Sequence, residues 1–264
     1  MNRDVIWIGD VLKVNFGGFV PLSTVDWPGR AVCTVFFRGC PVRCHYCHNA
    51  SIQTGEDLRD VEAVADLIRS SRLVVSGVIF SGGEATLQKQ PLLELARASK
   101  EMGLAVGVQT NGVFPGTLRA LIDEGLVDRI ALDIKARWEH YHNLLKVKPE
   151  VVDKVKESLE LCKEAFLNGT LPEFEVVTTI FPGKEDDVQY IAREAEGVDF
   201  VLQQGVEGSI SPLTFEQLKQ IADKIGRGVK IRTREDGEVA YENNRIIIAD
   251  SIVLTDIMQA RRNL

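Results

Sequence analysis

Short runs rich in β-branched and aromatic residues alternate along this chain with stretches of helical periodicity. The predicted strands cover residues 31–37, 74–80, 104–109, 129–134, 174–181 and 199–203. The predicted helices between them cover residues 59–71, 88–102, 116–124, 150–167 and 185–196. Strands separated by helices of this length form repeated βα units with a parallel sheet, so the sequence predicts an α/β fold curved into a full or partial barrel. A helix at 213–225 and the segments 229–233 and 245–249 would pack at one end.

The segment before the first predicted strand mixes turn-forming and apolar residues. Residues 17–29, with the sequence GGFVPLSTVDWPG, are typical of a structured loop or short strand that leads into the core. Asp26 is the only acid in this stretch. A turn or capping role is the commoner one for such an aspartate.

Length and composition favour a single domain over residues 1–264 and a place in the cytoplasm. A chain of 264 residues is near the size of one α/β barrel. No apolar run approaches the length that spans a bilayer, and the start MNRDVIWIGDV lacks the pattern of a secretory signal. The cysteines are odd in number and partly clustered, unlike a secreted disulfide framework. The net charge of -7 argues against nucleic acid as the main partner.

A cysteine-rich loop directly follows the first predicted strand. Cys40, Cys44 and Cys47 stand in the pattern CxxxCxxC. Three thiolates suit a four-iron cluster that keeps one iron open. His45 or His48 could instead complete a zinc site, and a redox pair with a spare thiol also fits. The loop by itself leaves these alternatives open.

Two further motifs follow later predicted strands. Ser81-Gly82-Gly83-Glu84 comes after the second strand, where glycines let the backbone approach a ligand and Glu84 can accept from an ammonium. Asp133-Ile134-Lys135 comes after the fourth, where Lys135 can pair with a ligand carboxylate. Alone, each would more often be a turn with a surface charge. Because the carboxyl ends of parallel strands meet at one edge, we expect these motifs and the cysteine loop to face one mouth.

Polar residues follow two more of the strands. Gln109-Thr110-Asn111-Gly112 ends the third strand, and Thr110 could coordinate a monovalent cation together with Asp133. Gln203 and Gln204 end the sixth strand and offer neutral amides to the same mouth. Simple hydrogen bonding at the strand end explains these two glutamines equally well.

The combination is more specific than its parts. An open iron, an acceptor for an ammonium and a cation for a carboxylate together suit an amino-acid ligand that chelates the cluster. The chain resembles the radical S-adenosylmethionine (SAM) superfamily. The resemblance rests on CxxxCxxC with Tyr46 before the last cysteine, followed by GGE in the next βα unit. A narrower resemblance, to the activating enzymes of glycyl-radical enzymes, is carried by residues 23–29, 37–40, 46–49, 110–112 and 133–135. Within these it is nearest to the longer form of anaerobic ribonucleoside-triphosphate reductase activating protein, with pyruvate formate-lyase activating enzymes as near relatives.

This resemblance implies a fold, a cofactor and a reaction. The fold is a partial (β/α)6 barrel with a core of about residues 17–205 and a C-terminal extension of about 206–264. Its cofactors are a [4Fe-4S] cluster, SAM and a monovalent cation. One electron from the cluster would cleave SAM to methionine and a 5′-deoxyadenosyl radical, which takes a hydrogen from a glycine of a partner enzyme. A flavodoxin- or ferredoxin-type protein would supply the electron.

The resemblance also assigns site residues. The cluster would be bound by Cys40, Cys44 and Cys47, and Asp26 would hold the glycine loop of the partner. SAM would contact Tyr46, Gly82, Gly83, Glu84, Thr110, Asn111, Asp133, Lys135 and Gln204.

Two positions depart from the family pattern. Trp27 stands where many activases have glycine, and Gln109 stands where the pyruvate formate-lyase type has an acid. The extra cysteine clusters of some activases are absent, so the sequence predicts one cluster.

We expect Cys33 and Cys162 to be buried core residues. For the histidines of Trp138-Glu139-His140-Tyr141-His142, a surface or capping role is expected.

Two other functions remain as alternatives. A related family uses the same radical chemistry on a small molecule, in the ring contraction that gives a deazaguanine. A zinc-binding module without enzymatic activity would explain the cysteines but would leave GGE and DIK without a role.

Overall fold

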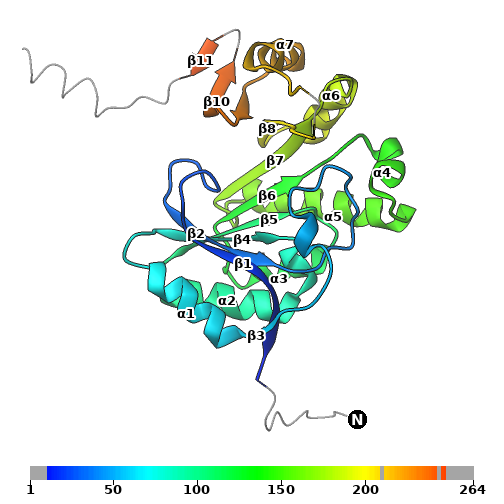
Figure 1. The fold of residues 1–264 in the computed structure, drawn as a ribbon. Coiled ribbons are helices and arrows are strands. Elements are labelled where there is room, and N and C mark those ends of the chain that lie inside the picture. The colour runs from blue at the N-terminus through cyan, green and yellow to red at the C-terminus, as the bar shows by residue number, and fades with distance from the viewer. Residues whose placement is uncertain (1–10, 209–210, 243–244, 248–264) are drawn as a thin grey trace, which may run out of the picture. The chain divides into compact units, whose positions relative to one another are not determined.

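The computed structural model describes residues 11–208, 211–242 and 245–247 (Figure 1). The chain forms two compact units, Met1–Val176 and Val177–Leu264, and the boundary falls within strand β7 (Glu173–Ile180). The single domain over residues 1–264 stays a prediction. No helix among the described residues is long and apolar enough to cross a membrane.

The sheet of the first unit is built around four parallel strands. Its strands are β1 (Lys13–Ser23), β2 (Val32–Phe37), β3 (Leu58–Asp60), β4 (Gly77–Gly82), β5 (Ala105–Thr110) and β6 (Arg129–Asp133). They lie in the order β3-β1-β2-β4-β5-β6. Strands β2, β4, β5 and β6 pair in parallel, whereas β1 runs antiparallel to both β2 and β3. The four parallel strands therefore place their carboxyl ends at one edge.

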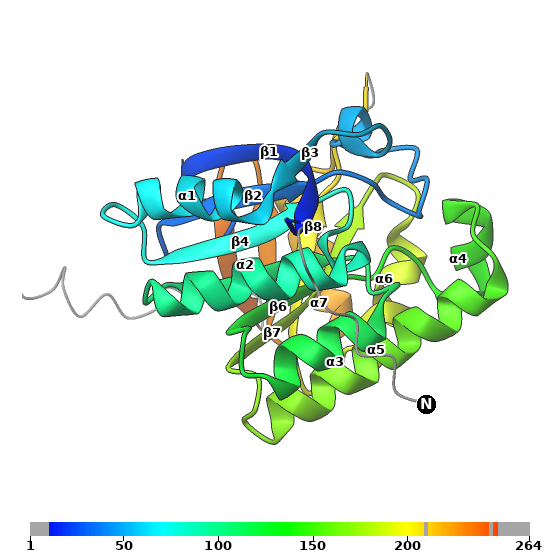
Figure 2. The same ribbon diagram turned by 90° about the horizontal axis from the view of Figure 1, so that it is seen from below.

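Helices cover one face of this sheet, as the view from below shows (Figure 2). They are α1 (Val61–Ser71), α2 (Lys89–Glu101), α3 (Pro115–Asp123) and α5 (Pro149–Leu167). Helix α4 (Trp138–Leu145) lies to one side (Figure 2), and the 3-10 turns η1 (Ala50–Ile52) and η2 (Ala85–Leu87) belong to the connections that follow β2 and β4. Neighbouring helices pack on one another, α1 on α2, α2 on α3 and α3 on α5. The parallel strands are nearly continuous apolar runs, and in β2 and β4 residues of both faces are buried. Phe37 and Phe80, both fully buried, meet edge to face with ring centroids 6.0 Å apart.

The described residues of the second unit contain two helices and a run of strands that starts within β7. Its strands are β7, β8 (Asp199–Gln204), β9 (Val229–Thr233), β10 (Gly237–Glu242) and β11 (Arg245–Ile247), in this order. Strands β8 and β9 are parallel, and β9, β10 and β11 form antiparallel pairs. The helices are α6 (Glu185–Glu194) and α7 (Phe215–Ile225). A capping box of Thr214 and Gln217 begins α7, and Gly226 ends it in the left-handed conformation with φ 77°.

The alternation predicted from sequence is confirmed. The six predicted strands correspond to β2 and β4–β8, and the predicted helices correspond to α1, α2, α3, α5, α6 and α7. The segment 229–233 is β9. Of the segment 245–249, residues 245–247 form β11 and the rest lies outside the described residues.

Strand β1 is longer than the short strand or loop that the sequence predicts. Gly17, Gly18 and Pro21 suggest a turn, but the strand accommodates them as irregularities in its pairing with β2. A Cβ atom at Gly17 would lie 2.9 Å from the Phe36 carbonyl oxygen, so the glycine allows a close approach of the two strands. Pro21 lies where the register shifts between Val20 and Ser23, and a missing N–H is tolerated there.

Helix α4 was not predicted, because a helix of eight residues gives a weak periodic signal. It buries Trp138 and Tyr141, which lie three residues apart on one face. His140 of this helix is exposed, as expected. The side chain of His142 lies outside the described ones.

Candidate active site

Three motifs far apart in the sequence are hydrogen-bonded to one another at the carboxyl ends of β2, β4 and β5. The backbone N–H of Glu84 donates to the Gly39 carbonyl oxygen at 2.9 Å. Asn49 of the cysteine loop donates from Nδ2 to the Gly82 carbonyl oxygen at 3.1 Å. The backbone N–H of Asn111 donates to Glu84 Oε2 at 2.8 Å. The cysteine loop, the GGE motif and the TNG motif therefore form one assembly.

The three cysteines of the loop are half-buried and form no disulfide. Burial raises the pKa of Cys40 to about 11. Burial also raises the pKa of Cys44, while the nearby Lys135 opposes this. Among the described residues, no three His, Cys, Asp or Glu side chains converge as ligands of one metal ion. A [4Fe-4S] cluster does not need such convergence, because each cysteine binds a different iron. Three thiols on one loop are a donor set that fits a [4Fe-4S] cluster with one open iron.

The remaining cysteines lie in the core, as predicted. Cys33 and Cys162 are fully buried, one in β2 and one in α5. Burial raises the pKa of the Cys33 thiol to about 11 and that of Cys162 to about 12. Both therefore stay protonated and unreactive.

Arg38 and Gln88 fix the base of the cysteine loop. The Arg38 guanidinium donates to the carbonyl oxygens of Phe16, Ser51 and Thr54 at 3.1 to 3.2 Å. Gln88 donates to the Arg38 carbonyl oxygen at 3.0 Å and exchanges two hydrogen bonds with the Asn15 backbone. Sequence reasoning missed both residues, because their partners are backbone atoms of segments distant in the chain.

The two glycines of the GGE motif allow it to lie directly on the cysteine loop. A Cβ atom at Gly82 would lie 2.3 Å from the Phe37 carbonyl oxygen, and one at Gly83 would lie 2.3 Å from the Gly39 carbonyl oxygen. Gly82 also has a φ of 121°, which side chains rarely adopt. Any other residue at either position would push the two loops apart.

Glu84 is a buried carboxylate surrounded by neutral donors. It is 2% exposed. Oε1 accepts from Thr86 N at 3.1 Å, Thr86 Oγ1 at 2.5 Å and Thr110 Oγ1 at 2.7 Å. Burial raises the pKa of Glu84, although the hydrogen bonds from Thr86, Asn111 and Thr110 favour the charged form. Sequence reasoning missed Thr86, although it stands two residues after the motif.

Lys135 lies between an acid and two tyrosines at the end of β6. Its Nζ is 3.1 Å from Asp133 Oδ2 and 5.8 Å from the centroid of the Tyr46 ring. Burial disfavours the charged form, but Asp133, Tyr46 and Cys44 raise the pKa of Lys135 well above its usual range. The side chain is therefore an ammonium that faces the cysteine loop. Tyr141 of α4 closes this group and donates to the Asp133 carbonyl oxygen at 3.4 Å.

Asp26 is tied to three strands of the first unit. Thr34 of β2 donates to Asp26 Oδ2 at 2.8 Å. Gln109 of β5 and Arg129 of β6 donate to the Asp26 carbonyl oxygen at 3.4 and 3.0 Å. Gln109 also accepts from Ser81 Oγ at 2.8 Å. One amide thus connects Asp26 with the strand end that carries the GGE motif.

The region beside Asp26 is filled by the Trp27 ring and by a buried ion pair of Arg129 with Glu175. Trp27 is 3% exposed, packs on Val32 and Ile79, and donates from Nε1 to Glu173 Oε2 at 3.0 Å. Arg129 pairs with Glu175 at 2.6 Å, and both side chains are almost fully buried. Charged residues inside otherwise apolar strands were the available signal for this pair, and sequence reasoning did not use it.

Gln203 and Gln204 are engaged within the second unit. Gln204 donates to the Leu213 carbonyl oxygen at 2.8 Å and accepts from Arg234 N at 3.3 Å. Gln203 Oε1 accepts from Arg232 at 3.3 Å. These contacts match the strand-end role, and a contact of Gln204 with SAM stays a prediction.

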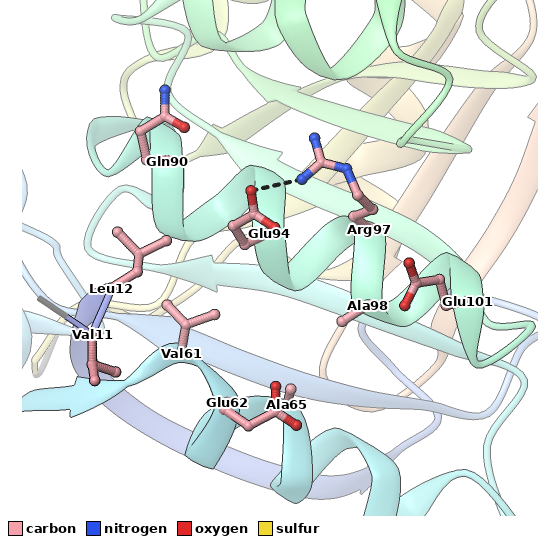
Figure 3. Close-up of a pocket in the computed structure, with 10 residues that line it drawn as sticks. All are labelled: Val11, Leu12, Val61, Glu62, Ala65, Gln90, Glu94, Arg97, Ala98 and Glu101. Carbon is pink, nitrogen blue, oxygen red and sulfur yellow. Dashed lines mark ion pairs between the residues drawn. The ribbon is translucent and has the colours of Figure 1, made fainter. Parts of the chain in front are cut away.

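A groove of about 670 Å³ lies between α1, α2 and the start of β1 (Figure 3). Glu62, Glu94 and Glu101 line it, and Arg97 pairs with Glu94 at 2.7 Å. None of the predicted site residues lines this groove. It lies among the helices and apart from the four strand-end motifs.

The model of the Radical SAM superfamily matches residues 34–195. A Methanocaldococcus jannaschii protein provisionally named a glycyl-radical enzyme activating enzyme is 33% identical over 199 residues, which are 73% of this chain and 80% of that protein. Pyruvate formate-lyase 1-activating enzyme of Escherichia coli K12 is 32% identical over 212 residues, 76% of this chain and 80% of the enzyme. A structure of TYW1 with a lysine-pyruvate adduct bound superposes with a TM-score of 0.60 at 15% identity, over 81% of this chain and 80% of that one.

The fold and the matched segment define a class of protein: the chain belongs to the radical SAM superfamily. Within it, the chain belongs to the glycyl-radical enzyme activating enzymes and is an enzyme of that kind. The predicted α/β fold of the radical SAM type is confirmed. The family implies a [4Fe-4S] cluster and SAM, which favours the iron-sulfur interpretation of the cysteine loop over the zinc one.

Proposed function

We propose that this activating enzyme generates its glycyl radical on an anaerobic ribonucleoside-triphosphate reductase. The observation that carries the proposed site is the hydrogen-bonded assembly of the cysteine loop, Glu84 and Asn111 at one edge of the parallel sheet. The choice of this partner rests on the motif resemblance of residues 23–29, 37–40 and 46–49. Pyruvate formate-lyase is the second candidate, because its activating enzyme in Escherichia coli is similar over most of this chain.

In this proposal Cys40, Cys44 and Cys47 would hold three irons of the cluster and would leave the fourth to SAM. When bound, the reduced cluster supplies the electron that cleaves SAM to methionine and a 5′-deoxyadenosyl radical. A flavodoxin- or ferredoxin-type protein is the proposed donor of that electron. The chain itself positions the cofactor and excludes water.

The proposed site has a carboxylate for the ammonium of SAM, that of Glu84, and an ammonium for the carboxylate of SAM, that of Lys135. A carboxylate has about four lone-pair sites. Glu84 Oε2 accepts from Asn111 N at 2.8 Å and would also accept from the ammonium of SAM, beside the Gly82 and Gly83 backbone. The Lys135 ammonium would pair with the carboxylate of SAM, and the Tyr46 ring would lie by the adenine. Thr110 and Gln204 complete the proposed contacts with the cofactor.

A monovalent cation beside Asp133 is a further part of the proposal. The half-exposed carboxylate of Asp133 faces Lys135 at 3.1 Å and has a second oxygen for a cation. Replacing potassium by choline in the assay should then slow SAM cleavage at low SAM concentration. An unchanged rate would remove the cation from the proposal.

Asp26 is the proposed contact for the glycine loop of the partner. Its Oδ2 accepts from Thr34 at 2.8 Å, and its carbonyl oxygen is held by Gln109 and Arg129. A carboxylate fixed in this way can accept from a backbone N–H of an incoming loop without having to be ordered first.

The test uses anaerobically reconstituted enzyme with dithionite and SAM. Mass spectrometry should detect 5′-deoxyadenosine, and a Cys44→Ala control should make none. A reductase whose radical-site glycine carries deuterium at Cα should then transfer deuterium to 5′-deoxyadenosine and show a glycyl radical by electron paramagnetic resonance.

The outcomes test separately the partner protein, the class of substrate and the cluster ligands. Deuterium from pyruvate formate-lyase and none from the reductase would show that the partner is wrong. If neither protein transfers deuterium and a small molecule does, the enzyme acts on a small molecule. A full complement of iron together with undiminished 5′-deoxyadenosine in Cys44→Ala would overturn the assignment of the cysteines.

A further inference from the structure

The side chain of Asn111 reaches the cysteine loop from the end of β5. Its Nδ2 lies 3.6 Å from Cys40 Sγ, within hydrogen-bonding reach of the larger sulfur atom. Cys40 is the first cysteine of the loop and follows the residue on which the GGE motif packs. The contact therefore joins the TNG motif directly to a cysteine proposed as a cluster ligand.

Two other hydrogen bonds fix the orientation of the Asn111 amide. Asn111 Oδ1 accepts from the backbone N–H of Val113 at 3.1 Å, and the Asn111 N–H donates to Glu84 Oε2 at 2.8 Å. Because Oδ1 already accepts a backbone N–H, the amide must present its NH₂ group to the sulfur. Asn111 is 7% exposed, so water competes little for that group.

We infer that Asn111 is a positioning residue that donates an N–H···S hydrogen bond to Cys40 and makes the cluster easier to reduce. The inference rests on the proposed ligation of the cluster by Cys40. Reduction adds a negative charge to the cluster and its thiolates, and a donor aimed at a thiolate stabilises the more negative state. Glu84 holds the Asn111 backbone, so the motif proposed to bind SAM also sets this donor in place.

The test is a redox titration of the reconstituted full-length enzyme, with the reduced cluster followed by electron paramagnetic resonance. Asn111→Asp keeps an oxygen for the Val113 N–H but replaces the donor by an anionic oxygen. Asn111→Ala removes both groups. The midpoint potential should become more negative in both variants, most of all in Asn111→Asp. If Asn111 only holds its own loop, the uncharged variant Asn111→Ala will titrate like the wild type.

Asn49→Asp is the matched control. It places the same charge in the cysteine loop, where the Asn49 amide donates to a carbonyl oxygen and not to a sulfur. A shift in Asn111→Asp no larger than that in Asn49→Asp would overturn the inference, because charge alone would then explain it.

A second measurement uses the wild-type enzyme and does not depend on whether the variants load a cluster. With ¹⁵N-labelled asparagine, electron-nuclear double resonance of the reduced cluster should show a ¹⁵N coupling and an exchangeable proton. Absence of both would overturn the inference. Cys40→Ala separates this failure from that of the proposed function, because a full cluster in Cys40→Ala would show that the ligation itself is wrong.

Discussion

Two buried glutamates of the first unit are accommodated in opposite ways. Glu84 is surrounded by neutral donors, two threonine hydroxyls and two backbone N–H groups, all at the carboxyl ends of β4 and β5. Glu175 faces a guanidinium, that of Arg129, which also contacts Asp26 and lies over the Trp27 ring.

The difference reflects what each group has to do. A carboxylate held by neutral donors keeps its charge available, so a cationic ligand group can still be attracted to Glu84. A carboxylate paired with arginine is neutralised and serves the packing around Asp26 and Trp27. The first arrangement suits a binding site, and the second suits a scaffold beneath it.

The largest effect is expected from Arg129→Met, which breaks the charged arrangement. It removes the guanidinium that faces the buried Glu175 together with a hydrogen bond to Asp26. Removing one partner of a buried pair costs about 3–5 kcal/mol. Denaturant unfolding should show this loss in the free energy of unfolding. Arg129→Met combined with Glu175→Gln should recover part of it, and equal stability of the wild type and the single variant would contradict the scaffold role.

A smaller loss is expected from Glu84→Gln, which tests the neutral arrangement. The amide NH₂ of glutamine would face donors that now bond to the carboxylate, and a mismatched buried hydrogen bond costs about 1–3 kcal/mol. Affinity for SAM should also fall, measured by equilibrium binding to the reconstituted enzyme. Glu94→Gln, on the exposed surface of α2, is the control and should change neither quantity.

Gln109→Glu sharpens the comparison, because this residue connects the two regions. Glutamate can still accept from Ser81 but can no longer donate to the Asp26 carbonyl oxygen. We expect the KM for the partner protein to rise about fivefold, from the loss of about 1 kcal/mol. Formation of 5′-deoxyadenosine without partner should persist. Thr34→Val, which removes the hydrogen bond to the Asp26 carboxylate, should behave alike. An unchanged KM in both variants would argue against a substrate role for Asp26.

The smallest effect is a difference in pH dependence. Burial raises the pKa of Glu84 above its usual 4.5. The folded chain then retains a proton that the unfolded chain has lost, so this group lowers stability as pH rises from 4.5 to the folded-state pKa. The destabilisation caused by Glu84→Gln should accordingly be greatest at acid pH and diminish as pH rises. Unfolding of cluster-free protein at several pH values measures it, and a cost that grows with pH would reverse the sign.

The sequence by itself determined the βα alternation, the cysteine loop and the order of the strand-end motifs. Periodicity in apolar residues predicts strands and helices because each must bury one face or stripe. The carboxyl ends of parallel strands meet, so the βα alternation alone predicts that the motifs of residues 40–47, 82–84 and 110–111 lie near one another. The family resemblance supplied their proposed roles.

Only the tertiary structure decided which atoms of these motifs meet. Strand register and loop packing bring the Asn111 side chain to Cys40 and the hydroxyls of Thr86 and Thr110 to Glu84. They also place Gln109 between Ser81 and Asp26. The ion pair of Arg129 with Glu175 joins residues 46 positions apart. Local sequence patterns do not predict such contacts, because a buried polar group forms its hydrogen bond with whichever partner the packed chain brings within about 3 Å.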